Sequence, residues 1–239
     1  MKNTIYIYLL ILATACNSHG HPSENLLVNG SAELGRYDSI PPGWTSVQGP
    51  WHMLEGDSEH HDYGFAQEGK YFFFAGQDTL GILQQDVDVS KYATGIDAHK
   101  QLFTFHGFAQ SLDQGPNSDQ AMLTIQGLDS SKGKTVYSFS TDTTRSIAKW
   151  LPLSDSFVAP VSTRFIRVQL IAIRHVGGDN DGYFDNLILT TSSAGNQLSR
   201  NLLIIGAIAL LFIVVLVIVY RNRSARKNQP TKNINTVKS

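Results

Sequence analysis

The sequence contains a single cysteine, Cys16, among its 239 residues. One cysteine leaves no partner for an intrachain disulfide. A domain of this chain that works outside the cytoplasm must therefore be stable through its hydrophobic core or through a bound metal. Such a domain is more typical of bacteria than of animal secretion, and we expect a bacterial protein.

Short motifs of common hydrolases are also absent. The chain has neither the G-x-S-x-G turn of α/β-hydrolases nor the H-E-x-x-H pair of zinc proteases. The paired carboxylates of a glycosidase meet only in the fold, so the sequence leaves that possibility open. The middle of the chain is nevertheless small for a glycosidase, and we predict a protein that is not an enzyme.

Acidic residues are missing from both ends of the chain. All 20 Asp and Glu lie between Cys16 and Tyr220, together with 12 of the 19 Lys and Arg, so this central part has a net charge near −8. A negative domain is repelled by polyanions. The composition thus disfavours nucleic acid and anionic lipid as ligands of the central part.

The N-terminus has the layout of an export signal. Lys2 precedes an apolar run, and the small residues Ala13, Thr14 and Ala15 follow it. We predict a signal peptide over residues 1–15 and a short linker over 16–22. Ala13 to Cys16 resembles the box of bacterial lipoproteins, which implies lipidation of Cys16, although the same residues also suit an ordinary signal peptidase.

A second apolar run lies near the C-terminus. Residues 202–220 carry no charge and are long enough to cross a bilayer core of roughly 30 Å as a helix. The following residues, 221–239, contain six Lys or Arg and no acid, which predicts a cytoplasmic tail. We therefore expect a single-pass protein of the cell membrane, with residues 192–201 as a juxtamembrane linker. Removal of this end as a sorting tag is the alternative.

The central residues 23–191 alternate apolar and polar side chains with a period of two. The segments 102–106, 121–125 and 165–170 are examples, and Pro, Gly, Asn and Asp clusters separate such segments. This pattern is typical of strands with one buried face. It predicts an all-β domain, and its length suits a two-sheet jelly-roll β-sandwich.

Two segments at opposite ends of this domain are more specific. They are Asn25-Leu26-Leu27-Val28-Asn29-Gly30-Ser31-Ala32-Glu33, followed by Pro42-Gly43-Trp44, and Gly182-Tyr183-Phe184-Asp185-Asn186-Leu187-Ile188-Leu189. Together they resemble the first and last strands of galactose-binding-like jelly rolls, in particular carbohydrate-binding modules of the CBM4/9-like type. Ala32 departs from that pattern, which usually has an aromatic residue at this position.

The resemblance also implies a structural calcium ion where the first and last strands meet. It places the ion on Glu33 and Asp185, with backbone carbonyls nearby. Calcium takes six to eight oxygen ligands, and two carboxylates from distant sequence would join the chain ends. The alternative is that both side chains accept hydrogen bonds from turn backbone.

Recognition of sugar requires an aromatic platform and planar polar groups. Trp44 is expected in the core, whereas Trp51, next to a polar loop, is the better platform candidate. In the run Tyr71 to Phe74, Tyr71 and Phe73 share one face and Phe72 and Phe74 the other. One pair could serve as a platform, or both could be buried.

The sequence does not decide which polar groups face a groove. As ligand-binding candidates we name Trp51, Tyr71, Phe73, Gln110 and Arg174, and Gln84 and Asp113 are further polar candidates. The leading hypothesis is a membrane-anchored binding module for a glycan. A protein-interaction or adhesion module of the cell surface, with no sugar ligand, is the alternative.

Overall fold

The computed structural model describes residues 24–36, 39–56, 65–141, 144–145, 149–193, 204–218 and 220. The predicted signal peptide (1–15), Cys16 with the linker 16–22, and the predicted tail (221–239) lie outside these residues. The chain divides into two units, 1–193 and 194–239.

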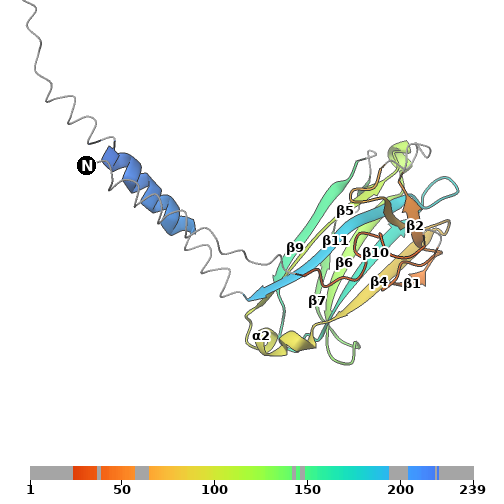
Figure 1. Cartoon of the computed structure of the whole chain (residues 1–239). Coiled ribbons are helices and arrows are strands. Elements are labelled where there is room, and N and C mark those ends of the chain that lie inside the picture. The colour runs from red at the N-terminus through yellow and green to blue at the C-terminus, as the bar shows by residue number, and fades with distance from the viewer. Residues whose placement is uncertain are drawn as a thin grey trace, which may run out of the picture. The chain divides into compact units, whose positions relative to one another are not determined.

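The first unit contains two antiparallel sheets (Figure 1). The first sheet has the strand order β1-β4-β10-β6-β7, with β8 beside β6, and the second has the order β2-β3-β11-β5-β9. The strands are β1 (Thr45–Gln48), β2 (His52–Glu55), β3 (Tyr71–Phe74), β4 (Leu80–Asp88), β5 (Gln101–Ser111), β6 (Gln120–Leu128), β7 (Thr135–Ser140), β8 (Thr144–Arg145), β9 (Leu151–Val158), β10 (Phe165–Ile173) and β11 (Gly182–Ser193). The predicted all-β, two-sheet sandwich is confirmed.

The long strands show why two sheets form. Along β4 and β10 every second side chain is buried and the residues between are half-exposed. Successive side chains of a strand point to opposite faces, so each sheet buries one face against the other. The enclosed core includes Trp44, Leu83, Phe105, Ile125 and Phe184. Trp44 therefore lies in the core, as the sequence predicted.

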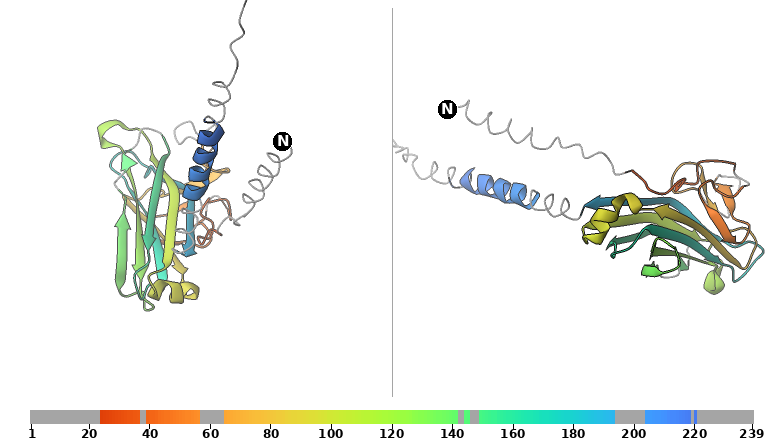
Figure 2. Two further views of the ribbon diagram at one scale, coloured as in Figure 1. Left: turned by 90° about the vertical axis from the view of Figure 1, so that its left-hand side faces the viewer. Right: turned by 90° about the horizontal axis from the view of Figure 1, so that it is seen from below.

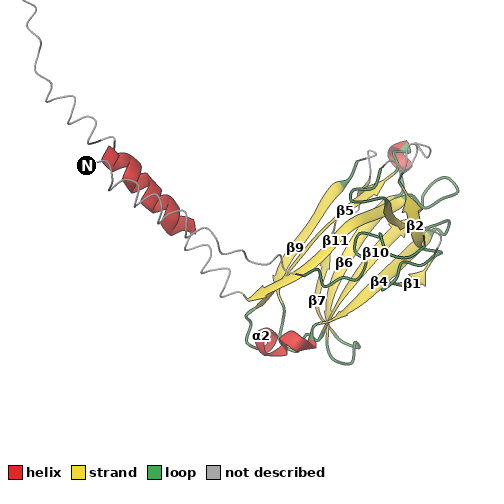
Figure 3. Cartoon of the chain, viewed as in Figure 1, coloured by secondary structure: helices red, strands yellow, loops and turns green. Residues whose placement is uncertain are grey.

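Two runs of consecutive strands alternate between the two sheets, as in a jelly roll. From β4 to β6, and again from β9 to β11, the chain changes sheet at each connection. Helical turns occupy opposite ends of the sandwich (Figure 3): η1 (Ser90–Tyr92) and α2 (Ala93–Asp97) at one end, and η2 (Gly115–Asn117) at the other. Figure 2 shows the same layers from two further sides.

The aromatic strand β3 is buried on both faces. Phe73 belongs to the main core, with Tyr71 packed against it, whereas Phe72 and Phe74 join Tyr183 in a smaller cluster. The predicted division of the run into two faces is confirmed. The use of Tyr71 and Phe73 as a stacking platform does not fit this burial, because the ring of Phe73 has no exposed surface.

The N-terminal segment has no strand where the resemblance implies one, because residues 24–36 form turns. This segment nevertheless runs alongside β11 and is hydrogen-bonded to it. Asn25 accepts hydrogen bonds from the N–H groups of Leu27 and Leu189 and donates to the carbonyl of Leu187. The N–H of Leu187 donates to the Gly30 carbonyl, at a register shift in β11 after Asp185. One asparagine thus replaces part of a strand ladder.

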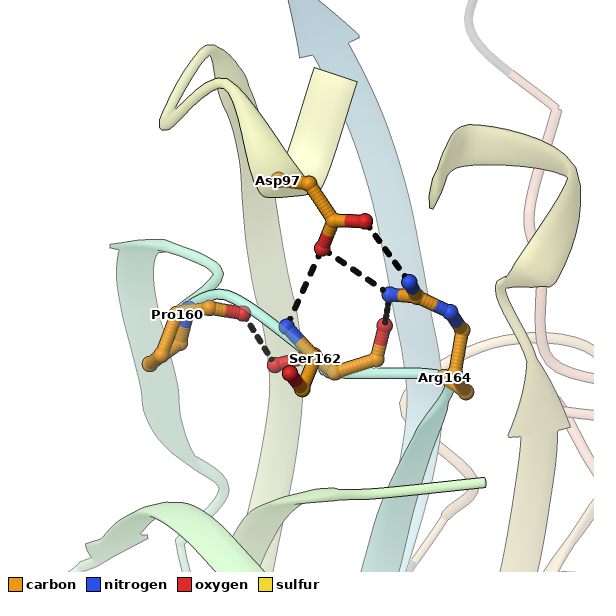
Figure 4. Close-up of polar contacts among 5 residues, drawn as sticks. Asp97, Pro160, Ser162 and Arg164 are labelled. Atoms are coloured by element: carbon orange, nitrogen blue, oxygen red, sulfur yellow. Dashed lines mark hydrogen bonds and ion pairs between the residues drawn. The ribbon is translucent and has the colours of Figure 1, made fainter. Parts of the chain in front are cut away.

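An ion pair closes the α2 end of the sandwich (Figure 4). Asp97, the last residue of α2, accepts two hydrogen bonds from the Arg164 guanidinium and one from the N–H of Ser162. Ser162 has a positive φ of 73°, which strains a residue with a side chain. The Asp97 carboxylate and the bond from Thr163 to the Pro160 carbonyl hold this turn in place.

Two buried carboxylates organise the opposite end. Asp119 accepts hydrogen bonds from the N–H groups of His175, Val176 and Asp181. Asp181 accepts from the Tyr183 hydroxyl at 2.6 Å and from the Gln114 amide at 2.9 Å. In the acidic loop 179–181, Asn180 and Asp181 are buried. Burial raises the pKa of Asp181 to about 6, and the charge of Asp119 adds to the effect.

In the second unit, residues 204–218 and 220 are helical. Within the described part of the chain, no helix combines the length and hydropathy that a membrane span requires. Ser192 and Ser193, expected in the linker, are the last residues of β11.

We predict that Asp181 makes the domain less stable as pH rises from about 4 to about 7. The folded protein binds the Asp181 proton more tightly than the unfolded chain does, so the free energy of unfolding falls across this window. Allowing for partial solvation, we expect a loss of about 1 kcal/mol. Asp181→Asn should remove this part of the pH dependence in urea unfolding.

The Asp181→Asn variant can keep its hydrogen bonds. The Oε1 atom of Gln114 is buried and has no hydrogen-bond partner among the described residues. Rotation of the Gln114 amide would let this oxygen accept from the introduced amide. A stability difference between wild type and variant that stays constant from pH 4 to pH 7 would contradict the prediction.

Candidate functional site

The outer face of the first sheet carries its polar side chains in rows. Residues paired across neighbouring strands have their side chains on the same face. The register therefore defines an amide row and a charged row next to it. The amide row consists of Thr45, Gln84, Gln169, Thr124 and Ser140, and the charged row of Asp86, Arg167, Gln126 and Ser138.

The amide row is joined by side-chain hydrogen bonds. The Nε2 of Gln169 donates to the Oε1 of Gln84 at 3.1 Å, and the hydroxyl of Thr124 donates to the Oε1 of Gln169 at 3.2 Å. All three side chains are half-exposed. Five strands spaced about 4.8 Å apart make this row roughly 19 Å long. The face thus offers a continuous line of planar donors and acceptors.

The charged row is held by a two-bond ion pair. Arg167 donates from Nε and Nη2 to the two carboxylate oxygens of Asp86, at 2.7 and 3.0 Å. Lys132, from the turn before β7, lies 3.0 Å from Asp86 Oδ2. These partners, Arg167 above all, lower the pKa of Asp86 despite its partial burial. The charges are therefore fixed in place before any ligand arrives.

Apolar side chains border the polar rows on both sides. An aliphatic row of Ile82, Ile171 and Met122 lies beside the amide row. On the other side, Phe165 follows the charged row, with the Lys132 ammonium 4.3 Å from its ring centre. The face therefore combines fixed polar groups with apolar contact area.

Such a face suits a ligand with many hydroxyl groups. Amides, a carboxylate and a guanidinium both donate and accept, and a half-exposed position lets them exchange water for ligand. Within the described residues we find no arrangement of a nucleophile, a base and an acid on this face.

The structure separates the ligand-binding residues that the sequence suggested. Trp51 is 1% exposed and packs near Phe184 in the core, so its ring offers no platform. Its position beside a polar loop was misleading, because the side chain points between the sheets. Gln110 is 4% exposed, on β5 of the second sheet. Arg174 donates to the Gly178 carbonyl at 2.5 Å and so holds a loop.

Glu33 and Asp185 meet at one segment. The Oε1 of Glu33 accepts from the N–H groups of Lys70 and Tyr71, and the Oδ2 of Asp185 accepts from those of Gln67 and Glu68. Both carboxylates thus hold turn backbone. This is the alternative that the sequence left open.

The electrostatics of this pair fit a cation. Burial raises the pKa of Asp185 to about 7, and the nearby charge of Glu33 adds to the effect, although three backbone N–H groups act against it. The donors are hard oxygen atoms, which calcium prefers. Among the described residues, no group of three His, Cys, Asp or Glu is placed to hold a metal. The remaining ligands would have to be carbonyls or water.

A pocket of about 460 Å³ lies beside the same pair. Its lining includes Asn29, Ser31, Glu33, Glu68 and Asn186. The pocket opens where the N-terminal segment passes the register shift of β11. The pocket lies at the junction of the N-terminal segment with β11, and it is separate from the polar rows on the first sheet.

Sequence reasoning missed most of the face. Gln84 was considered, but Asp86, Arg167 and Gln169 were not. A signal existed: β10 is otherwise apolar but carries Arg167 and Gln169 at alternate positions, and β4 carries Gln84, Asp86 and Asp88 at alternate positions. Polar side chains on the outer face of two central strands indicate a surface open to solvent.

Comparison of the sequence with profiles of known protein families and with curated protein sequences finds no match. Among solved structures, the chain resembles a domain of tailspike protein 4 of bacteriophage CBA120, with 15% identity, a TM-score of 0.48, and coverage of 70% of this chain and 21% of that one. It also resembles TmCBM61 in complex with β-1,4-galactotriose, with 15% identity, a TM-score of 0.46, and coverage of 71% and 100%.

A third similar structure is the CBM22-1 xylan-binding domain of Paenibacillus barcinonensis Xyn10C. It has 14% identity and a TM-score of 0.45, over 72% of this chain and 97% of that one. Several of these solved structures are thus carbohydrate-binding modules. At such identities and TM-scores, the likeness does not extend to what any of these proteins binds.

Proposed function

We propose that the protein is a carbohydrate-binding module that is not an enzyme, and that the outer face of its first sheet binds the glycan. The observation that carries the proposal is the amide row beside the Asp86–Arg167 pair. Sugar hydroxyls need donors and acceptors in fixed, planar groups, and these two rows supply them over five strands. The CBM4/9-like pattern of the chain ends agrees with this proposal.

The charges of the face favour a glycan over an anionic polymer. Asp86 neutralises one of the two cations beside it, and Asp88 lies two residues further along β4. The face therefore has no large excess of positive charge, and nucleic acid is not expected to bind there. A protein partner would instead be expected to use a larger apolar patch.

We predict that Gln169→Ala weakens glycan binding about tenfold. The change removes the central amide of the row, and Gln84 and Thr124 lose the hydrogen bonds that orient them. Arg167→Met should have at least the same effect, because it also leaves Asp86 without its main partner. A glycan array with the full-length chain in mild detergent would identify ligands, and titration of the variants would give affinities.

Gln67→Ala is the matched control for the glycan test. Gln67 is exposed, and its backbone N–H donates to Asp185 of β11 in the second sheet, away from the proposed glycan-binding face of the first sheet. The Gln67→Ala variant should bind the glycan with the affinity of the wild type. Binding that is lost equally in the control and in Gln169→Ala would place the site elsewhere. A folded chain that binds no glycan would move the proposal to a protein partner.

We further propose that Glu33 and Asp185 hold a structural calcium ion. The ion would neutralise two neighbouring carboxylates and thereby join the N-terminal segment to β11. Calcium at 100 times its Kd would add about 2.7 kcal/mol of stability, which for a domain of this size raises the melting temperature by roughly 5 to 10 °C. We predict that Glu33→Gln removes this response to calcium.

The calcium test compares melting curves in calcium and in EGTA. Glu55→Gln is the control, because Glu55 is a nearby carboxylate that forms an ion pair with the exposed Lys70. Its response to calcium should be that of the wild type. If Glu33→Gln lowers the melting temperature equally in both buffers, the two carboxylates act only as acceptors for backbone N–H groups.

We also propose that the module is displayed outside a bacterial cell membrane. The support is the export signal over residues 1–15 and the uncharged apolar run 202–220 with its basic tail. Lipidation of Cys16 would add a second anchor. The proposal predicts that the full chain stays in the membrane fraction after an alkaline carbonate wash, and that a chain ending at residue 201 with Cys16→Ser does not.

External protease should digest the sandwich in intact spheroplasts and leave the tail. A mature protein whose mass lacks residues after 201 would instead indicate a cleaved sorting tag.

A further inference from the structure

The outer face of the first sheet has an apolar region that hydroxyl recognition does not use. The aliphatic row of Ile82, Ile171 and Met122 lies one row away from Gln84, Gln169 and Thr124. Leu80 and Ile173 extend the apolar region to the end of β4 and β10, where Ile173 is paired on its other side with the buried Gln120 of β6. All five apolar side chains are half-exposed, and none belongs to the two hydrophobic clusters of the interior.

The spacing of the rows matches the width of one sugar ring. Neighbouring rows are two residues apart along each strand, which is about 7 Å. A hexose whose ring hydroxyls bind the amide row therefore places the substituent on the far side of its ring over the aliphatic row. What this substituent is decides whether the contact stabilises or destabilises the complex.

A methyl group is favoured at this position. It gains from burial against Ile82 and Ile171, at about 0.8 kcal/mol for each buried carbon. A hydroxymethyl group over Ile171 would bring a hydroxyl against the aliphatic side chains of Ile82, Ile171 and Met122, because the amide paired in this row, Gln48, lies beyond Ile82 on β1. Burial of an unpaired hydroxyl costs free energy.

We propose that the face selects saccharides that carry a methyl group, either the C6 methyl of a 6-deoxyhexose or the methyl of an acetyl substituent. This inference rests on the proposed glycan-binding function. The amide row supplies affinity for the ring hydroxyls, and the aliphatic row supplies the preference. Neither the amide row nor the aliphatic row contains an aromatic residue, so the selection uses aliphatic contact in place of stacking.

The test compares ligand pairs that differ only in the relevant group. Methyl fucoside against methyl L-galactoside tests the C6 methyl, and methyl N-acetylglucosaminide against methyl glucoside tests the acetyl group. Affinities of the full-length chain in mild detergent would be measured by NMR titration. We expect at least one pair to show a preference of about fourfold or more for the member with the methyl group.

Variants separate this preference from binding itself. Ile171→Thr keeps a β-branched side chain but puts a hydroxyl in the aliphatic row. The ratio of affinities within a ligand pair should therefore fall toward one, and the sugar without the methyl group should bind as well as before or better. Val158→Thr is the matched control, because Val158 is exposed on β9 of the second sheet. It should keep the wild-type preference.

The outcomes distinguish the two proposals. Glycan binding with equal affinity for both members of each pair overturns the methyl selectivity and leaves the proposed function standing. Failure of all saccharides to bind overturns both. A preference that persists in Ile171→Thr also overturns the assignment, because the methyl group would then bind away from the aliphatic row.

Discussion

The pairing of β4, β10 and β6 is the constraint on which the rest of the structure depends. Nine consecutive residues of β10 are in register with β4 on one side and with β6 on the other. Because strands alternate faces, this single register decides both what is buried and what is displayed. Leu83, Val168 and Ile125 enter the core only if Gln84, Gln169 and Thr124 form one row outside.

The fold holds its ends together with carboxylates where secreted domains often use disulfides. Asp119 binds three backbone N–H groups at one end of the sandwich, Asp97 binds Arg164 and the strained Ser162 turn at the other, and Asp185 binds the segment before β3. Each bond of this kind satisfies a backbone donor in a turn that has no strand partner. The cost is charge in poorly hydrated places, which is why the pKa values of Asp181 and Asp185 are raised.

The sequence was sufficient to predict the sandwich but not the site. Period-two alternation is a property of each strand alone, so β5, β6 and β10 could be recognised from their own residues. Which strands are neighbours is a property of the whole chain, and the row that joins Gln84 to Gln169 cannot be seen without it. The same gap explains Trp51: its neighbours in sequence are polar, whereas its neighbours in space are Phe184 and the core.

The aromatic run shows the same limit of sequence reasoning, because a site was predicted there and the side chains are buried instead. The chain has a run of four from Tyr71 to Phe74, which suggested a platform, but strand β3 lies between β2 and β11 and is covered on both faces. The aromatic side chains of this run therefore serve the interior, and the displayed face has amides, one ion pair, aliphatic groups and the ring of Phe165. Open-face contacts of this kind give modest affinity per site, because each hydrogen bond replaces one to water. Display of many copies on one membrane, as we propose, would offset this weakness through avidity, because each further contact then forms at a high local concentration.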